Sequence, residues 1–208
     1  MKSATLYKFR SFDNWKLILD ILVNKRMYAA PFHMLNDPME GRYYYFGSAV
    51  SRGFERALMR SKSRRNILSL SKTKTNTLLW SYYAGGHTGV AIGIRRPKDA
   101  VSSLVVRDVT YDSGVYLDAK AVQRPPEQLA LDILTQKQMP WEHEHEVRVF
   151  SDENYVRVTV VELVLGCNTS FLDESLFRQL AKRCHPRVPV TKLRRSALDE
   201  PNAVDWQR

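Results

Sequence analysis

Hydrophobic and polar positions follow regular spacings along most of the chain. Apolar residues recur at helical spacing from residue 15 to 22, which predicts a helix capped by Asp13 or Asn14. The same pattern predicts helices over residues 48–61, 77–84, 126–138 and 170–183. Extended apolar or alternating runs predict strands over residues 6–10, 27–30, 66–71, 88–94, 104–111, 144–150, 155–165 and 187–193.

The order of these elements indicates the fold class. Strands outnumber helices, and the helices are inserted irregularly, without the even alternation of a doubly wound parallel sheet. We therefore expect an α+β protein with a mixed or mostly antiparallel sheet. Residues 1–208 are interpreted as a single domain, in which 167–197 supply a helix and a final strand and 198–208 form an irregular tail.

Composition narrows the class of protein. Hydrophobic residues make up 44% and aromatic residues 11% of the 208 positions, which is typical of a folded globular chain. No apolar run approaches the roughly 20 residues of a membrane span, and the first residues lack the apolar stretch of a secretion signal. With Cys167 and Cys184 as its two cysteines, we expect a cytoplasmic protein whose thiols are reduced.

The charge is strongly basic, at +10, and this suggests a polyanionic partner such as nucleic acid or a phosphate-rich cofactor. The basic residues gather in two clusters, over residues 52–65 and 182–195. A solvated surface that keeps the protein soluble explains such clusters equally well.

The stretch Trp141-Glu-His-Glu-His-Glu-Val-Arg-Val-Phe150 is the most informative segment. Its strict alternation predicts a strand, with one face formed by Glu142, Glu144, Glu146 and Arg148. Neighbouring carboxylates repel each other. Such a face is therefore either open to water or a site where one glutamate meets positive charge that develops in a substrate.

Other polar positions carry weaker signals. Lys8 and Arg10 share one face of the first strand and suit a diphosphate or a carboxylate, although protective charges on an edge strand are the alternative. The segment Asn36-Asp-Pro-Met-Glu40 is explained by turn chemistry alone. Trp80-Ser-Tyr-Tyr83 supplies aromatic rings that belong to the core or stack a nicotinamide or a base. Gly85 and Gly86 are interpreted first as a helix stop.

Several reaction classes lack their motifs. The chain has no Walker loop, no dinucleotide-binding fingerprint and no GxSxG elbow. His143 and His145 share a strand face but have no further ligand at metal-site spacing, so we expect no metal.

Taken together, the segments resemble a bacterial family, domain of unknown function 2971, over residues 6–166. The resemblance is carried by four motifs in the family's order: Leu6-Tyr-Lys-Phe-Arg10, Asn36-Asp-Pro-Met-Glu40, Trp80-Ser-Tyr-Tyr-Ala-Gly-Gly-His-Thr-Gly-Val90 and Trp141-Glu-His-Glu-His-Glu-Val-Arg148. Met39 and Tyr82 depart from the usual Phe and His.

The layout of the elements is also similar to that of ADP-ribosyltransferases of the DarT type. This resemblance implies that Glu146 is catalytic and that Glu144 assists it, by orienting an acceptor or by raising the pKa of Glu146. Arg148 would pair with Glu146 or hold a phosphate. The residues expected to contact NAD are Lys8, Arg10, Asn36, Tyr82, Tyr83, His87 and Arg148.

The resemblance implies an enzyme that consumes NAD, as an ADP-ribosyltransferase acting on RNA or DNA or as an NAD glycohydrolase. Such an activity suits a toxin or an anti-phage defence effector, with an antitoxin or a defence protein as its partner. Two alternatives remain open: a nucleic-acid-binding module without catalysis, and a regulatory partner in a defence complex.

Overall fold

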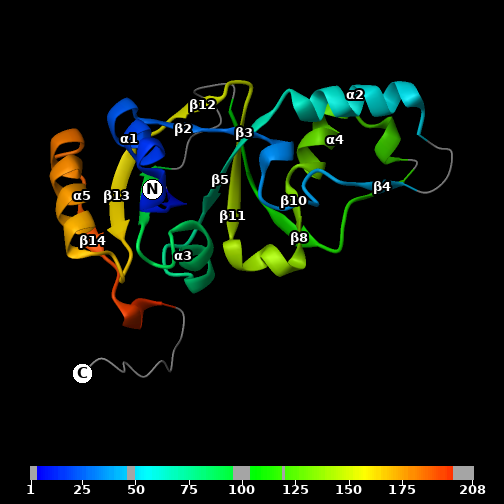
Figure 1. Cartoon of the computed structure of the whole chain (residues 1–208). Coiled ribbons are helices and arrows are strands. Elements are labelled where there is room, and N and C mark those ends of the chain that lie inside the picture. Colours follow the sequence, from blue (N-terminus) through cyan, green and yellow to red (C-terminus); the bar gives the residue numbers. More distant parts are fainter. Residues whose placement is uncertain (1–3, 46–49, 96–103, 119, 199–208) are drawn as a thin grey trace. The chain divides into compact units, whose positions relative to one another are not determined.

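The computed structural model describes residues 4–45, 50–95, 104–118 and 120–198 (Figure 1). The chain separates into two compact units. The first unit is drawn from 1–27, 70–97 and 157–208, and the second from 28–69 and 98–156. Three strands span a boundary between the units in sequence: β2 (Arg26–Tyr28), β5 (Asn66–Ser71) and β12 (Tyr155–Arg157).

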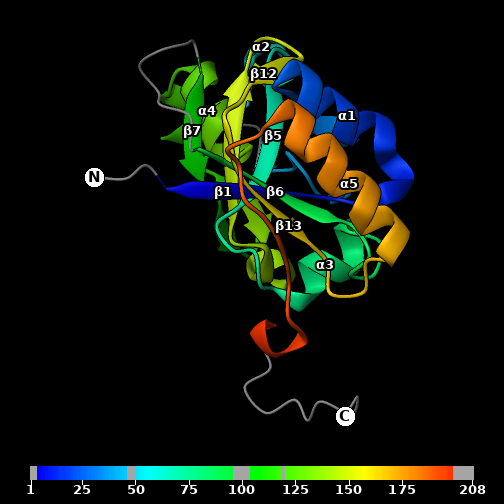
Figure 2. The same cartoon turned by 90° about the vertical axis from the view of Figure 1, so that its left-hand side faces the viewer.

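The first unit is built on a sheet in the order β14-β13-β6-β1. Figure 2 labels β13, β6 and β1 of this sheet. Antiparallel pairing joins β1 to β6 along its whole length, while β13 is antiparallel to β6 and parallel to β14. On its other side β1 pairs with the end of β5, at Tyr7 and Ser71. The elements are β1 (Thr5–Arg10), η1 (Phe12–Asn14), α1 (Trp15–Asn24), α3 (Thr77–Tyr83), β6 (Val90–Arg95), β13 (Val160–Leu165), α5 (Phe171–Cys184), β14 (Val190–Lys192) and η5 (Arg195–Ala197).

The second unit places β11 between β5 and β7, with β7 antiparallel to β11. Two short parallel pairs, β8 with β10 and β4 with β9, lie outside this sheet. The elements are β3 (Ala30–Pro31), η2 (Phe32–Met34), β4 (Tyr44–Tyr45), α2 (Arg52–Ser63), β7 (Val105–Asp108), β8 (Thr110–Asp112), β9 (Tyr116–Leu117), η3 (Ala121–Gln123), α4 (Pro126–Ile133), β10 (Gln136–Gln138), η4 (Met139–Glu144) and β11 (Glu146–Ser151).

Helix α2 shows how the sequence sets local structure. The Ser51 hydroxyl accepts a hydrogen bond from the backbone N–H of Phe54, which begins the helix. Leu58 is fully buried and packs with Leu129 and Ile133 of α4. Arg52, Arg56 and Arg60 recur every four residues and therefore share one face of α2. This face is exposed and lies opposite to buried Leu58.

The α+β class with a mixed sheet is confirmed, since parallel and antiparallel pairs both occur. The predicted strand at 66–71 and helix at 77–84 agree with β5 and α3. The start of the predicted helix at 48–61 and the tail at 199–208 lie outside the described residues. That 1–208 form a single domain stays a prediction.

Some predicted elements are wrong. The predicted helix at 126–138 ends at Ile133, because residues 136–138 pair in parallel with β8. The predicted strand at 155–165 divides, since Val158 donates its N–H to Lys25 before β13 begins. The predicted strand at 104–111 divides likewise into β7 and β8. Ser11 is the residue whose side chain caps the first turn, in place of Asp13 or Asn14.

Two smaller features complete the fold. Cys167 and Cys184 carry free thiols. Among the described helices, none combines the length and the apolar character that crossing a bilayer requires.

Candidate functional site

The segment before β11 does not form the predicted acidic strand. Residues 139–144 form the 3-10 helix η4, His145 adopts a left-handed conformation with φ 45°, and β11 begins only at Glu146. The N–H of His145 donates to the carbonyl of Glu142, which closes the turn. Glu142 and Glu144 therefore share no strand face with Glu146, and the continuous row of carboxylates is wrong. Glu146 and Arg148 do share a face of β11.

Arg148 uses all of its hydrogen-bond donors inside the second unit. Its Nε and Nη2 donate to the Glu146 carboxylate at 2.9 and 3.1 Å, and its Nη1 and Nη2 donate to the Glu40 carboxylate at 2.8 and 2.5 Å. The fifth N–H reaches the Leu134 carbonyl at 2.6 Å. A guanidinium has five N–H groups, and this side chain is fully buried. The structure thus favours the pairing role for Arg148 over contact with a phosphate.

Glu146 is held as a carboxylate. Burial alone would raise its pKa, but the charges of Arg148 and Lys137 and hydrogen bonds from Arg148 and Ser69 lower the pKa to about 2. This is opposite to the increase that was expected from Glu144. The backbone N–H of Glu146 donates to the Tyr111 hydroxyl at 2.8 Å. Burial and the neighbouring carboxylates raise the pKa of Tyr111 to about 12, so its phenol stays neutral.

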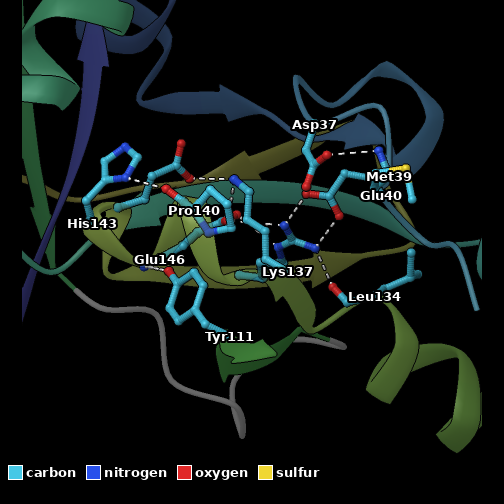
Figure 3. Close-up of polar contacts among 11 residues, drawn as sticks. Asp37, Met39, Glu40, Tyr111, Leu134, Lys137, Pro140, His143 and Glu146 are labelled. Carbon is cyan, nitrogen blue, oxygen red and sulfur yellow. Dashed lines mark hydrogen bonds and ion pairs between the residues drawn. The ribbon is translucent and has the colours of Figure 1, made fainter. Parts of the chain in front are cut away.

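Lys137 connects Glu144 to Glu146. Figure 3 shows Lys137 beside Glu146. Its Nζ donates to Glu144 at 2.5 Å and to Glu146 at 3.3 Å, and it lies 4.6 Å from the centre of the Trp141 ring. Sequence reasoning missed Lys137 because it placed residues 136–138 at the end of a helix. On β10, alternation directs Lys137 to one face and its neighbours Gln136 and Gln138 to the other.

The side chains of Glu40, Lys137, Glu144, Glu146 and Arg148 form a buried charged cluster in which acidic groups outnumber basic ones. The three carboxylates of Glu40, Glu144 and Glu146 face the two cations Lys137 and Arg148, so the ionised set sums to −1. Burial raises the pKa of Glu40, an effect that the adjacent Arg148 opposes. All five side chains are at least nine-tenths buried. In such surroundings a charge acts strongly on a neighbouring group.

A small pocket in the same unit borders this cluster. It has a volume of about 30 Å³. The residues that line it are Asp37, Met39, Gly41, Arg42, Tyr44, Gly114, Val115, Gln136, Lys137 and Gln138. Lys137 belongs to both the pocket wall and the charged cluster, whereas Glu146 does not line the pocket.

The turn at residues 36–40 contributes to the cluster through a residue that sequence reasoning explained as turn chemistry. Asp37 accepts from the Met39 N–H at 2.9 Å, as in an Asx turn. That turn directs Glu40 to Arg148, whereas Asn36 is exposed. The signal for Glu40 was its place in the Asn36-Asp-Pro-Met-Glu40 motif.

The remaining predicted NAD contacts lie in the first unit. Lys8 and Arg10 are half-buried on β1, which pairs on both sides, so the alternative of an edge strand is wrong. The Nε of Arg10 and the Nδ1 of His87 are buried and make no hydrogen bond with the described residues. Each such group costs about 1–3 kcal/mol. Burial lowers the pKa of both side chains.

Aromatic rings surround His87 in that unit. Its imidazole stacks on Trp80 at 6.3 Å, and its Nε2 lies 3.3 Å from the Ser81 hydroxyl. Tyr82 is exposed, while Tyr83 packs partly against the core that contains Trp80. The predicted NAD contacts of these residues stay predictions.

Comparisons with known proteins complete the description. No protein-family model and no curated protein matches the chain, so the resemblance to domain of unknown function 2971 is not supported. Among solved structures, the chain is similar to Thermus sp. 2.9 DarT in complex with ADP-ribosylated single-stranded DNA. The identity is 12% and the TM-score 0.42, over 94% of this chain and 96% of that one.

Proposed function

We propose that the chain is an NAD-consuming ADP-ribosyltransferase or NAD glycohydrolase and that Glu146 is its catalytic carboxylate. One observation carries the proposal: Glu146 is buried, held ionised, and part of a cluster with one excess negative charge beside a pocket. When the bond between nicotinamide and ribose breaks, its electron pair leaves with nicotinamide and the sugar becomes positive. A fixed carboxylate stabilises that charge.

The low pKa of Glu146 defines its role further. A carboxylate with a pKa of about 2 is a weak base, so Glu146 acts through its charge and by accepting a hydrogen bond from the ribose 2′-hydroxyl. The proton of the attacking hydroxyl or water passes to solvent or to another group. Lys137 contacts Glu146 by the longest hydrogen bond in the cluster, 3.3 Å, and the sugar would replace it there.

A nucleic acid is the acceptor that the charge favours. The net charge of +10 attracts RNA or DNA and disfavours cationic acceptors. The biological setting proposed with it is a toxin or an anti-phage defence effector, with an antitoxin or defence protein as partner.

Nicotinamide release tests the proposal. Purified protein is incubated with NAD, with and without RNA or single-stranded DNA, and free nicotinamide is followed by proton NMR. Glu146→Gln should reduce the rate at least 100-fold, while Glu142→Gln, an exposed glutamate of η4, should match the wild type. No release by a folded wild-type protein under any of these conditions would refute the proposal.

A binding module without catalysis is the second candidate, and the arginines of α2 favour it. Arg52, Arg56 and Arg60 are exposed and follow one another every four residues, about 6 Å apart along the helix. Like charges at this spacing destabilise a helix slightly, whereas phosphates would pair with them. Glu55, the acidic residue beside them, accepts a hydrogen bond from Tyr45 at 3.0 Å.

Salt dependence tests that candidate. Replacing Arg52, Arg56 and Arg60 by Gln should lower the slope of log affinity against log salt by about 2 for a single strand. The matched control removes three exposed charges from the other basic cluster, Lys182, Arg183 and Arg187. Equal slopes in all three proteins would remove α2 as the binding surface.

A further inference from the structure

We infer that the pocket beside Lys137 binds the polar edge of an unpaired nucleobase. The first observation is an unsatisfied acceptor: the Oε1 atom of Gln136 is buried and accepts no hydrogen bond from the described residues. Gln136 lines the pocket together with Gln138, the next residue on the same face of β10. An amide carries both a donor and acceptor, which is the combination that base edges match.

The second observation is a pair of tyrosines at the rim of the pocket. The ring of Tyr44, which lines the pocket, stacks on that of Tyr116 with centres 5.4 Å apart and planes inclined by 26°. Both rings are about half exposed, at 45% and 55%. Exposed tyrosine faces stack unpaired bases. A cation lies close by, since exposed Arg42 also lines the pocket and can pair with a phosphate.

The size of the pocket agrees with this arrangement. A volume of about 30 Å³ admits one or two small polar groups but no whole base. We infer that the edge of the base enters toward Gln136, whose closed-off amide turns into the pocket to meet it, while the flat face of the base lies on Tyr44. Gly114 helps to shape the rim: a side chain there would come within 3.2 Å of the Tyr44 ring, and its φ of 146° suits glycine.

Two ligands offer an unpaired base with a polar edge and a flat face: the acceptor strand and the adenine of NAD. A base inside a duplex offers neither its pairing edge nor its flat face, so the pocket selects single strands. The link from this pocket to chemistry at Glu146 rests on the proposed function, but binding of the base does not.

Binding measurements test the inference without catalysis. Affinities are measured by fluorescence anisotropy for a labelled 12-nucleotide single strand and the matching duplex, and by calorimetry for NAD, using the full chain. Gln136→Met and Tyr44→Ala should each lower, about tenfold, either the affinity for the single strand or the affinity for NAD. Tyr44→Phe, which keeps the aromatic ring, should retain the wild-type affinity. Gln128→Met, an exposed glutamine of α4, is the matched control.

The binding results distinguish the acceptor strand from NAD as the source of the base, and they distinguish this inference from the proposed catalytic function. Loss of strand binding with NAD unchanged assigns the pocket to the acceptor base, and the reverse assigns it to adenine. Wild-type affinity of Gln136→Met for both ligands overturns the inference. Equal binding of strand and duplex excludes the acceptor strand as the source of the base. Because Glu146→Gln keeps the pocket, its binding stays intact even where nicotinamide release fails.

Discussion

Arg148 and Glu146 lie two positions apart on β11, and the guanidinium of the first donates two hydrogen bonds to the carboxylate of the second, at 2.9 and 3.1 Å. The same guanidinium holds Glu40, which comes 108 positions earlier in the chain. Because Arg148 forms bidentate hydrogen bonds with both carboxylates, lysine cannot replace it here. This pair fixes the orientation of the proposed catalytic carboxylate.

The first prediction concerns stability. Arg148→Lys should lower the free energy of unfolding by about 3–5 kcal/mol, because a single ammonium cannot reach both Glu40 and Glu146 and so leaves one buried carboxylate without its cation. The matched control is Arg107→Lys on β7, directly opposite Arg148 in the sheet. Arg107 pairs with Asp132 at a partly exposed site, so its loss should cost about 0–1 kcal/mol. Urea unfolding measures both, and equal costs would contradict the buried role.

The second prediction is an acid transition. A carboxyl whose pKa is lower in the folded than in the unfolded chain stabilises the fold above its ordinary pKa, and this stability disappears as the pH falls toward the folded value. For Glu146 that window runs from pH 4.5 down to about 2. Acid unfolding followed by circular dichroism should therefore be shallower in this window for Glu146→Gln than for wild type. Identical acid transitions would show that Glu146 is not held ionised.

A third prediction follows from Lys62, which is buried in α2 and donates to the Gly41 carbonyl at 2.5 Å. Burial lowers its pKa from 10.5 to about 8. Between these values the unfolded chain binds the proton more strongly, so stability rises with pH. We expect an increase of about 1–3 kcal/mol from pH 8 to about 10 in wild type. Lys62→Met should remove that increase, and a persistent increase would assign it to another group.

The fourth prediction addresses the first unit. Under the proposed function, and with Arg10 as the NAD contact that the sequence predicts, Arg10→Gln should raise the KM for NAD about tenfold and leave kcat within about twofold, because a cation that only positions NAD contributes equally to ground and transition states. The control is Arg95→Gln, an exposed arginine at the end of β6. Steady-state nicotinamide release gives both constants. An unchanged KM would remove Arg10 from the NAD contacts, whatever the role of Glu146.

The sequence predicted elements well where one periodicity ran without interruption. The strand at 66–71 and the helix at 77–84 agree with the structure because local pattern and tertiary pairing coincide there. The alternating segment from Trp141 failed because Pro140 and the left-handed His145 fold its first half into a 3-10 turn. Alternation describes residue types, whereas backbone conformation at single positions decides where a strand begins.

The candidate site was predicted only in part. Glu146 and Arg148 were identified from their own segment, because two positions on one strand share a face. Glu40 was not, since it lies 108 positions from Arg148 and no local pattern encodes such a contact. Lys137 was missed although it is close to Glu146 in sequence, because residues 136–138 were predicted to be helical and instead form β10. Arg148 was assigned two alternative roles, and only the arrangement of its five N–H groups distinguishes them.

The ion pair between Glu40 and Arg148 has a consequence for the newly made chain. Residue 40 leaves the ribosome long before residue 148, and the charged cluster cannot assemble until both are present. Contacts of such sequence separation also form late in folding. Under the proposed function, a growing chain that ends before β11 would lack both Glu146 and the guanidinium that holds it, so the proposed catalytic site would form only after residue 148 has been made.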